Sequence, residues 1–442
     1  MTTSFIQVLF FLLAGIAVII LLTAKYRVHA FFALLLACFL VGFGVQLSFA
    51  NILTAVKEGF GGILKSLGII IVLGTTLGVV LERSGCTRIM ANFILKKTGE
   101  KKASLAMSIS GFIVGLPVFC DSGFIVLSGL NRSLANRTGI PMVIMSVSLA
   151  TGLYSVHCLI PPHPGAAAAA ATLGVDFGKL ILIGMAVALP GMIVGHLWAQ
   201  FAGKKIQQLH VAHEHTQDHG PGPSVTRAFL PVVVPIILIA INSFLSIVNN
   251  IPLIIHKIFS VLGEPIMALS VGIILAFASI HSWTRQEVGK LLQDGAEKAG
   301  GILVIIGAGG AFGAVLSAAK MGEHFSEAMN LQNMSIFFPF LIAFILKTAQ
   351  GSSTVAIITA SSIVLPLLPA LGLDSENGKL VCVLAMGAGS MMVSHANDAY
   401  FWVISKFSGL ELRTMLKTYS IATILMGLTT LLTVYILSLM IL

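Results

Sequence analysis

Apolar stretches of about 20 residues recur along the entire chain, and they restrict its possible folds more than any other feature of the sequence. Of the 442 residues, 57% are hydrophobic and 10% are charged. A soluble core could not bury so much apolar surface, whereas each stretch is long enough, as a helix, to cross roughly 30 Å of hydrocarbon. The composition therefore predicts an all-α polytopic membrane protein without a sizeable extramembrane domain.

The apolar stretches form two series that follow the same order. A polar, histidine-containing segment separates them, so we predict an N-terminal transmembrane repeat at 1–202, a linker at 203–227 and a C-terminal transmembrane repeat at 228–442. The octapeptides GTTLGVVL (74–81) and GGAFGAVL (309–316) support the repeat. The predicted spans are 5–23, 28–48, 66–82, 103–130, 140–174 and 180–201 in the first half, and 228–250, 264–281, 299–318, 335–371, 380–405 and 415–442 in the second.

Two spans in each half are broken by helix-disrupting residues. The spans 103–130 and 335–371 contain LPVFCDSGF and KTAQGSSTVA, and each is predicted to be a pair of helices joined at a tip. The spans 140–174 and 380–405 contain SVHCLIPPHPG and MVSHANDAYFW. Interruptions at matching positions of two halves are typical of the binding sites of secondary transporters, because unwound backbone leaves peptide groups free to hold a solute. The sequence therefore predicts a transport protein.

The distribution of Lys and Arg predicts the orientation. The loop at 83–102 contains six basic residues, which places it in the cytoplasm and the N-terminus outside. If each broken pair is a re-entrant hairpin, the remaining basic loops also face the cytoplasm, as does the linker, and the C-terminus lies outside. The halves are then inverted-topology repeats, each of about five transmembrane helices plus one hairpin. Hairpins that cross the membrane completely would give the same sidedness, so charge alone leaves both arrangements open. The run from Phe5 to Leu22 lacks signal-peptide features and is predicted to be a retained helix.

The two predicted hairpin tips carry polar side chains suited to a small solute. In the first tip Asp121 supplies a carboxylate, next to Ser122 and Gly123, and an ionised Asp in mid-membrane is tolerated mainly in a polar cavity. Its alternative role is to cap the following helix. The second tip offers short hydroxyl and amide groups at helix starts that favour an anion, although these hydroxyls could instead bond helix carbonyls. These second-tip residues are Gln350, Gly351, Ser352, Ser353 and Thr354.

Lys347, close to the second tip, could add a positive charge to the site or could reach the membrane interface instead. The interrupted spans contribute His157 and His163 in the first half, and His395, Asn397 and Asp398 in the second. A histidine or a partly buried carboxyl group can carry a proton at ordinary pH, although a buried histidine can equally be a fixed hydrogen-bond bridge. Asp398 is the first candidate for a coupling proton, followed by Asp121 and His395.

Several functional classes lack support in the sequence. The net charge of +9 is placed mainly in short loops, where it sets orientation and does not indicate nucleic-acid binding. No GxxxxGK[ST] sequence is present, so transport driven by ATP would need a separate chain. Neither the five scattered cysteines nor the histidines have the spacing of a metal site, and the linker histidines are expected to be solvated. No cofactor is therefore expected.

At these residues the chain resembles the gluconate permease family, the gluconate:H⁺ symporters and their D-serine relatives within the ion transporter superfamily. The stretches that carry the resemblance are GLPVFCDSGFIVL, IPPHPGAAAAA, TAQGSSTVA and SHANDAYFW, and it covers essentially the whole chain. The resemblance implies a homodimeric, proton-coupled symporter of small hydroxy-carboxylates in a bacterial inner membrane, working by an elevator-like movement. The site positions that it implies are Asp121, Ser122, Gly123, His163, Gln350, Gly351, Ser352, Ser353, Thr354, His395, Asn397 and Asp398.

The substrate and the coupling ion stay open at this point. The chain has CDSG and HPGA where typical gluconate carriers differ, so glycerate or another sugar acid is as open as gluconate. A sodium-coupled carboxylate carrier and a permease for D-serine or another small amino acid are the alternatives. A membrane enzyme would gather its polar groups on one side of the bilayer, and a channel would not need two occluding hairpins, so both are disfavoured.

Overall fold

The computed structural model describes residues 5–204, 223–245, 252–279, 283–321, 323–324, 333–395 and 398–442. All regular structure in these ranges is helical, which confirms the all-α prediction. Five helices are long and apolar enough to cross a membrane, or up to seven if each of two bent helix pairs counts as one span. The five are Phe5–Thr23, Phe177–Gly203, Val225–Asn242, Arg285–Ala318 and Leu412–Ile441.

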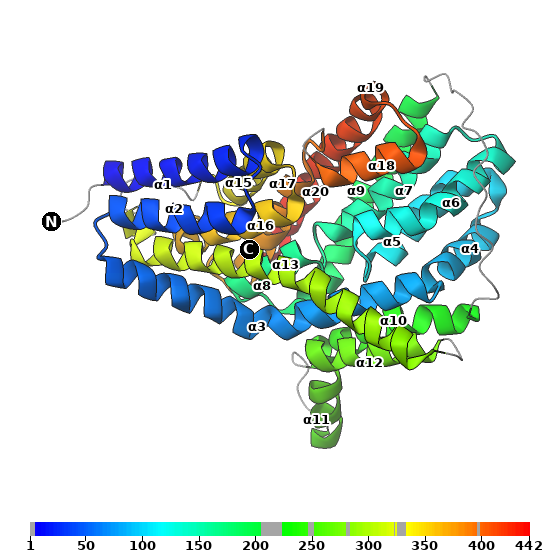
Figure 1. The fold of residues 1–442 in the computed structure, drawn as a ribbon, viewed down its shortest axis with the longest axis horizontal. Helices are drawn as coiled ribbons and strands as arrows, with labels where there is room; N and C mark the ends of the chain where they lie inside the picture. The colour runs from blue at the N-terminus through cyan, green and yellow to red at the C-terminus, as the bar shows by residue number, and fades with distance from the viewer. Residues whose placement is uncertain are drawn as a thin grey trace.

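The first half runs from α1 to α9 (Figure 1). Short π-helical and 3-10 segments follow α1 and α4. The helices are α1 (Phe5–Ile20), α2 (Ala30–Gly44), α3 (Phe49–Arg83), α4 (Cys86–Thr98), α5 (Ala103–Gly115), α6 (Cys120–Thr138), α7 (Met142–His157), α8 (Pro164–Leu173) and α9 (Phe177–Gly203).

The second half repeats this order of long and broken helices, with a π-helical segment at Leu416–Ser420 that leads into the last helix. Part of the predicted linker lies outside the described residues. The helices are α10 (Val225–Leu245), α11 (Leu253–Leu262), α12 (Pro265–Ala278), α13 (Arg285–Ala318), α15 (Phe337–Gln350), α16 (Ser353–Val364), α17 (Glu376–Met391), α18 (Ala399–Ser408), α19 (Leu412–Met415) and α20 (Ile421–Ile441).

Each of the four interruptions predicted from the sequence is a helix break in the structure. Pro117 lies between α5 and α6, and Pro161 and Pro162 lie between α7 and α8, where a proline removes a backbone donor. Gly351 ends α15 with a φ of 82°, a conformation that is open to glycine at little cost. Asp398 caps the start of α18 after an irregular segment that follows α17. The breaks divide what would be single spans into short helices.

Two elements differ from the predicted spans. Helices α3 and α13 are 35 and 34 residues long, well beyond the predicted 66–82 and 299–318. Their N-terminal parts carry charged residues, such as Lys57 and Glu58 in α3 and Arg285 and Glu287 in α13, which lower the hydropathy of these parts. The cytoplasmic loop predicted at 83–102 contains α4, which buries one apolar stripe that includes Met90 and Ile94. Hydropathy detects apolar spans and therefore misses amphipathic helices of this kind.

The helices of the two halves pack in corresponding pairs. Helix α3 packs along α13, and α9 packs along α20. Helix α6 of the first half contacts α18 of the second, and α16 of the second half contacts α8 of the first. Within the halves, α5 packs on α7 as α15 packs on α17, and α1 packs on α2 as α10 packs on α12. The short helices that follow the breaks therefore meet across the boundary between the halves.

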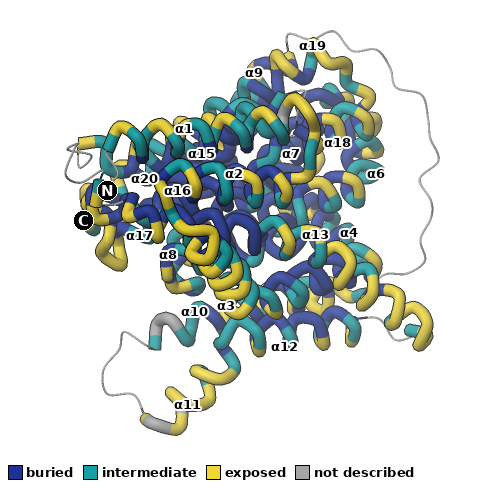
Figure 2. The backbone as a smooth tube through the Cα atoms, turned by 60° about the vertical axis from the view of Figure 1, so that its left-hand side comes forward, coloured by how far each residue is buried: buried dark blue, intermediate teal, exposed yellow. Residues whose placement is uncertain are grey.

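The degree of burial differs strongly between the helices (Figure 2). Helix α7 is buried along nearly its whole length, and every residue of α16 is buried except Thr354, whereas α11 is largely exposed. Apolar side chains such as Ile6 and Phe10 on α1 are exposed, as expected for a surface in contact with lipid chains. All five cysteines are buried and free, in agreement with a packing role. They are Cys38, Cys86, Cys120, Cys158 and Cys382.

The repeated octapeptide explains part of this packing. It places two glycines one turn apart on each long helix. On α3, a Cβ added at Gly74 would lie 2.9 Å from Pro162, and one at Gly78 would lie 3.1 Å from the carbonyl oxygen of Pro117. On α13, a Cβ added at Gly313 would lie 3.3 Å from Cα of Ser362 on α16. The glycines thus allow the long helices to approach broken segments closely.

We predict that Gly74→Val destabilises the protein by about 1–3 kcal/mol, because the side chain would overlap a rigid proline ring. The measurement is the melting temperature of the purified protein in detergent. Gly62→Val on the same helix is the matched control, since an added Cβ there meets nothing within 4 Å. Equal melting temperatures for the two variants would contradict the assigned packing.

Candidate functional site

One histidine of each interrupted span bonds to the hairpin tip of its own half. The Nε2 atom of His163 lies 2.6 Å from the carbonyl oxygen of Gly115, at the end of α5. The Nε2 atom of His395 lies 3.0 Å from the carbonyl oxygen of Thr348, near the end of α15. A carbonyl oxygen only accepts hydrogen bonds, so each Nε2 atom donates. The histidines therefore satisfy peptide groups that the helix breaks leave free.

The first interrupted span also contacts the second half directly. Helix α8 starts beside the start of α16, where a Cβ added at Gly165 would lie 3.2 Å from Cα of Thr354. A Cβ added at Gly387 on α17 would lie 2.7 Å from the carbonyl oxygen of Cys158. The phenolic oxygen of Tyr154 on α7 donates to the Ser390 carbonyl of α17 at 3.1 Å. The breaks of both halves therefore meet in one region inside the helix bundle.

A buried ion pair joins the second hairpin tip to the second interrupted span. The Nζ atom of Lys347 lies 2.7 Å from Oδ2 of Asp398 and 2.6 Å from the carbonyl oxygen of Gly351. The Lys347 side chain is 0% exposed and that of Asp398 is 8% exposed. The alternative prediction that Lys347 reaches the membrane interface is therefore wrong, because its ammonium group is held within the protein by two oxygens.

Asp398 has further bonds that fix its carboxylate. Its Oδ1 atom accepts a hydrogen bond from the backbone N–H of Tyr400 at 2.9 Å, which caps α18. Its Oδ2 atom also accepts from the hydroxyl of Ser394, four residues earlier. The carboxylate is thus shared by a helix end, a hydroxyl and an ammonium group. Ser394 was not predicted as a site residue. Its position in MVSHANDAYFW, four residues before Asp398, could have indicated that its hydroxyl reaches the carboxylate.

The second hairpin tip contains polar groups with different surroundings. The hydroxyl of Ser352 accepts from the backbone N–H of Val355 at 3.3 Å and caps α16, so it bonds an amide and not a helix carbonyl. Ser353 is buried, and Thr354 is half-buried. Both amide atoms of Gln350 are buried without a hydrogen-bond partner among the described residues. Because an unpaired buried amide is costly, Gln350 has unused capacity to bind a ligand.

The first hairpin tip is only partly drawn into this region. Asp121 is exposed, and its Oδ1 atom accepts from the backbone N–H of Ser122 at 2.8 Å in the first turn of α6. Gly123 is buried, and a Cβ added there would lie 2.7 Å from Leu153 on α7. The ring of Phe119 lies 6.1 Å from the ring of His163. The tip backbone therefore approaches the first interrupted span, while the Asp121 carboxylate faces an open surface.

His157 and an aromatic cluster complete the surroundings. The Nδ1 atoms of His157 and His163 are 3.3 Å apart, and the ring of His157 stacks on Tyr154. The hydroxyl of Tyr400 donates to the carbonyl oxygen of Ala150 at 3.3 Å. These tyrosines were not predicted, because aromatic residues in an apolar span give no polar signal. Asn397, which was predicted at the site, lies outside the described residues.

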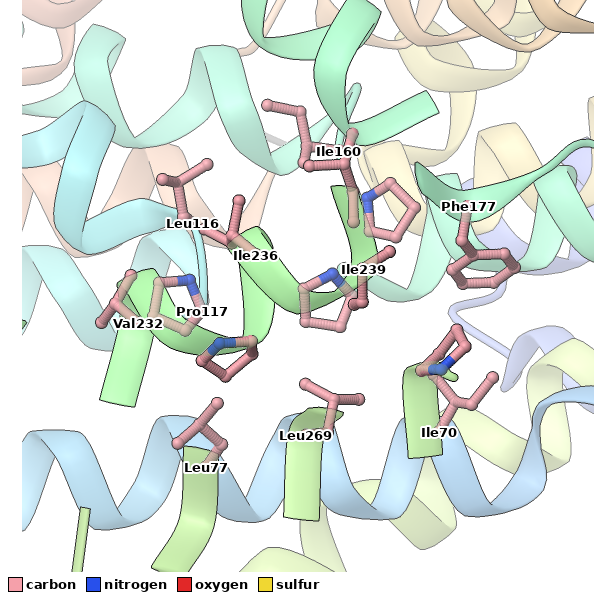
Figure 3. A pocket seen from close by; sticks show the side chains of 15 residues that line it. Ile70, Leu77, Leu116, Pro117, Ile160, Phe177, Val232, Ile236, Ile239 and Leu269 are labelled. Carbon is pink, nitrogen blue, oxygen red and sulfur yellow. The ribbon is translucent and has the colours of Figure 1, made fainter. Parts of the chain in front are cut away.

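A cavity beside this region is apolar (Figure 3). Its volume is about 40 Å³, and it separates the first hairpin tip and the first interrupted span from α3, α9, α10 and α12. Pro117 projects into it from the tip. None of the polar side chains described above lines it. The lining residues are Ile70, Leu77, Leu116, Pro117, Ile160, Pro161, Pro162, Phe177, Ile181, Val232, Pro235, Ile236, Ile239, Pro265 and Leu269.

Metal binding finds no support in the ranges that the structure describes, where no three His, Cys, Asp or Glu side chains gather in a suitable group. His163 and His395 bond to backbone carbonyls, as described above. Long apolar helices, helix breaks and a buried polar centre together define a membrane transport protein.

The chain belongs to the GntP permease family, whose family model, described as GntP family permease, matches residues 7–440. It is therefore a permease and not an enzyme. A gluconate permease of Pseudomonas aeruginosa is 32% identical over 415 residues, which cover 91% of this chain and 91% of that protein. The D-serine transporter DsdX of Escherichia coli O6:H1 is 30% identical over 421 residues, which cover 93% of this chain and 94% of that protein.

The fold is also found in a solved structure. The YdaH transporter of Alcanivorax borkumensis matches with a TM-score of 0.67 and 15% identity, over 88% of this chain and 88% of that chain. At this level of identity the likeness concerns the fold alone. The resemblance to the gluconate permease family stated from the sequence motifs is thus confirmed.

We predict that Lys347→Met lowers the free energy of unfolding by about 3–5 kcal/mol, because it leaves the Asp398 carboxylate buried without its partner. The double variant Lys347→Met with Asp398→Asn should lose clearly less, since asparagine still caps α18 and carries no charge. The measurement is the melting temperature in sodium-free buffer. A double variant that loses the sum of the two single losses would contradict the direct pairing.

Proposed function

We propose that this permease is a secondary active symporter that imports gluconate or a related small hydroxy-carboxylate together with H⁺. The observation that carries the proposal is the meeting of both hairpin tips and both interrupted spans around a buried polar centre, within a chain of the GntP permease family. A binding site between two halves, away from both membrane surfaces, suits a carrier that opens to each side in turn.

The proposal includes an inverted repeat in which the two hairpins are re-entrant and enter from opposite sides. The corresponding helix pairs support it, because α6 meets α18 as α16 meets α8. The matching bonds of His163 to Gly115 and of His395 to Thr348 support it as well. A two-fold relation between the halves would produce both kinds of correspondence. It would place the linker in the cytoplasm and both termini in the periplasm.

The substrate proposed is a small anion with hydroxyl groups. The starts of α8 and α16 lie side by side and give partial positive charge at the polar centre, which favours a carboxylate. Gln350 has unpaired amide atoms for a hydroxyl group or a carboxylate oxygen. In this proposal Ser352, Ser353 and Thr354 contribute from the second tip, with Gly351, His395 and Asn397 close by, and Asp121, Ser122, Gly123 and His163 contribute from the first half. The relatives named above support this size class, since gluconate and D-serine are both small carboxylates that carry hydroxyl groups.

Proton coupling is assigned to Asp398, with Asp121 and His395 as further carriers. Asp398 lies at the polar centre and pairs with Lys347, so a proton taken up by its carboxylate would weaken this pair. Asp121 is exposed, unlike Asp398. Sodium coupling is the alternative, as oxygen-rich helix breaks also bind Na⁺. A permease for D-serine or another small amino acid is the alternative for the substrate.

An elevator-like movement is proposed for the hairpins and the interrupted spans. The apolar cavity supports it, because the side chains that the first tip and the first interrupted span place against α3, α9, α10 and α12 around this cavity are all apolar. Such a surface offers little resistance to sliding. A homodimer in the bacterial inner membrane is part of the same proposal and stays a prediction from the family resemblance.

We predict that the protein in proteoliposomes accumulates gluconate or another small hydroxy acid when an inward proton gradient is imposed. Addition of substrate should raise the external pH, and replacement of Na⁺ by choline should leave the rate unchanged. Uptake of radiolabelled sugar acids, glycerate and D-serine identifies the substrate. Uptake that follows a sodium gradient and ignores the proton gradient would exclude proton coupling.

We predict that Gln350→Ala raises the KM for the identified substrate about tenfold, as expected for the loss of one hydrogen bond to a charged or hydroxyl group. Gln293→Ala is the matched control, because Gln293 is exposed and bonds to Glu297 on the same helix. Initial uptake rates at several substrate concentrations give both values. An unchanged KM for Gln350→Ala would remove the second tip from the substrate site.

A further inference from the structure

We propose that the Lys347 ammonium group is a built-in cation that fills a monovalent-cation site between the second hairpin tip and the second interrupted span. Lys347 would then replace Na⁺ in this carrier. The inference rests on the proposed symport function and deepens it, since it explains why the proton would be the coupling ion. It also changes the role of Lys347 from a substrate ligand to a substitute for an ion.

The contacts of Lys347 are those of a bound ion. Its Nζ atom lies 2.6 Å from the carbonyl oxygen of Gly351 and 2.7 Å from Oδ2 of Asp398. The hydroxyl of Ser394 bonds to the same carboxylate oxygen. Carbonyl groups at the end of a half-helix, next to a carboxylate, are the ligands that secondary transporters use for Na⁺. Gly351 stands at such an end, because α15 stops at Gln350.

The first half shows that the fold does not require this charge pair. His163 with Gly115 corresponds to His395 with Thr348. Lys347 precedes Thr348 as Val114 precedes Gly115, and Asp398 follows His395 by three residues as Ala166 follows His163. Both counterparts, Val114 and Ala166, are buried and apolar. The same backbone arrangement therefore forms without an ion pair, and the pair is an addition confined to the second half.

The buried ion pair between Lys347 and Asp398 is not explained by a gain in folding stability. Removing two charges from water costs more than a single ion pair usually returns, and apolar replacements are often equally stable. The Lys347 side chain is fully buried and its stem enters from α15, so the ammonium cannot leave with the substrate. Because the Lys347 ammonium group is covalently attached to the carrier, it holds the second tip against the second interrupted span. Unlike a bound Na⁺, it cannot dissociate and cross the membrane as a free ion. The ion gradient must then act through the other ionisable group of the pair, Asp398.

The test measures the melting temperature of purified, substrate-free protein in NaCl and in choline chloride of equal concentration. Wild type should melt at the same temperature in both salts. Lys347→Ala exposes the oxygens of Gly351 and Asp398, and water can enter the space left by the side chain. This variant should be stabilised by Na⁺ by about 2 °C or more at concentrations well above the dissociation constant.

Two controls separate this effect from a general response to salt. Lys347→Ala combined with Asp398→Asn removes the charge of the cation site and should lose the response to Na⁺. Lys320→Ala, at an exposed lysine that pairs with Glu323, should show no response. If Lys347→Ala cannot be purified as a folded protein, Lys347→Gln takes its place. Na⁺ should raise the melting temperature of Lys347→Gln as well, but by fewer degrees.

Stabilisation of wild type by Na⁺, or no response in both Lys347 variants, would overturn the inference. Because the measurement contains no substrate, that result would leave the proposed hydroxy-acid symport intact. Failure of wild type to take up any small carboxylate would overturn the proposed function and leave the cation site standing.

Discussion

A helix that stops inside a membrane exposes peptide groups that lipid cannot satisfy, and this structure depends on how those groups are bonded. The carbonyl oxygens at the ends of α5 and α15 accept hydrogen bonds from His163 and His395. The carbonyl of Gly351 accepts from Lys347. At the starts of α16 and α18, the side chains of Ser352 and Asp398 accept from backbone N–H groups. The polar residues of the candidate site thus hold the broken helices in place, so the requirements of folding and of binding fall on the same side chains.

The two halves share a backbone plan and differ in their chemistry. Both have a hairpin, an interrupted span and a histidine that links them. The second half adds a buried ion pair, whereas the first half places its carboxylate, Asp121, on an exposed turn. The proposed repeat would supply the geometry for two openings, whereas the proposed carrier of a single small solute would need only one set of charged groups. The charged side chains can therefore differ between the halves, while the helix breaks keep corresponding positions in both.

The sequence was a good guide to the fold wherever a local signal exists. Proline and glycine located three of the four breaks, since each acts through its own backbone geometry. The break before α18 has neither residue and was located by its polar side chains, among them His395 and Asp398. Hydropathy failed for α4 and for the N-terminal parts of α3 and α13, because a helix segment with charged residues beside a single buried stripe has a low average hydropathy. At the candidate site, the sequence predicted which polar residues take part, but it did not predict the hydrogen bonds and the ion pair that they form. Lys347 and Asp398 are 51 residues apart, and the carbonyl partners of the histidines carry no sequence signal at all.

The burial of all five native cysteines has a practical consequence for following this carrier at work. A bulky, charged maleimide that cannot enter the protein would find no thiol to modify in the wild type, since thiol chemistry requires an accessible thiolate. A single cysteine introduced at an exposed position outside the candidate site, such as Gln293, would then report on access from one side of the membrane against a silent background. Vectorial labelling could therefore use the natural chain, without first removing its sulfhydryl groups.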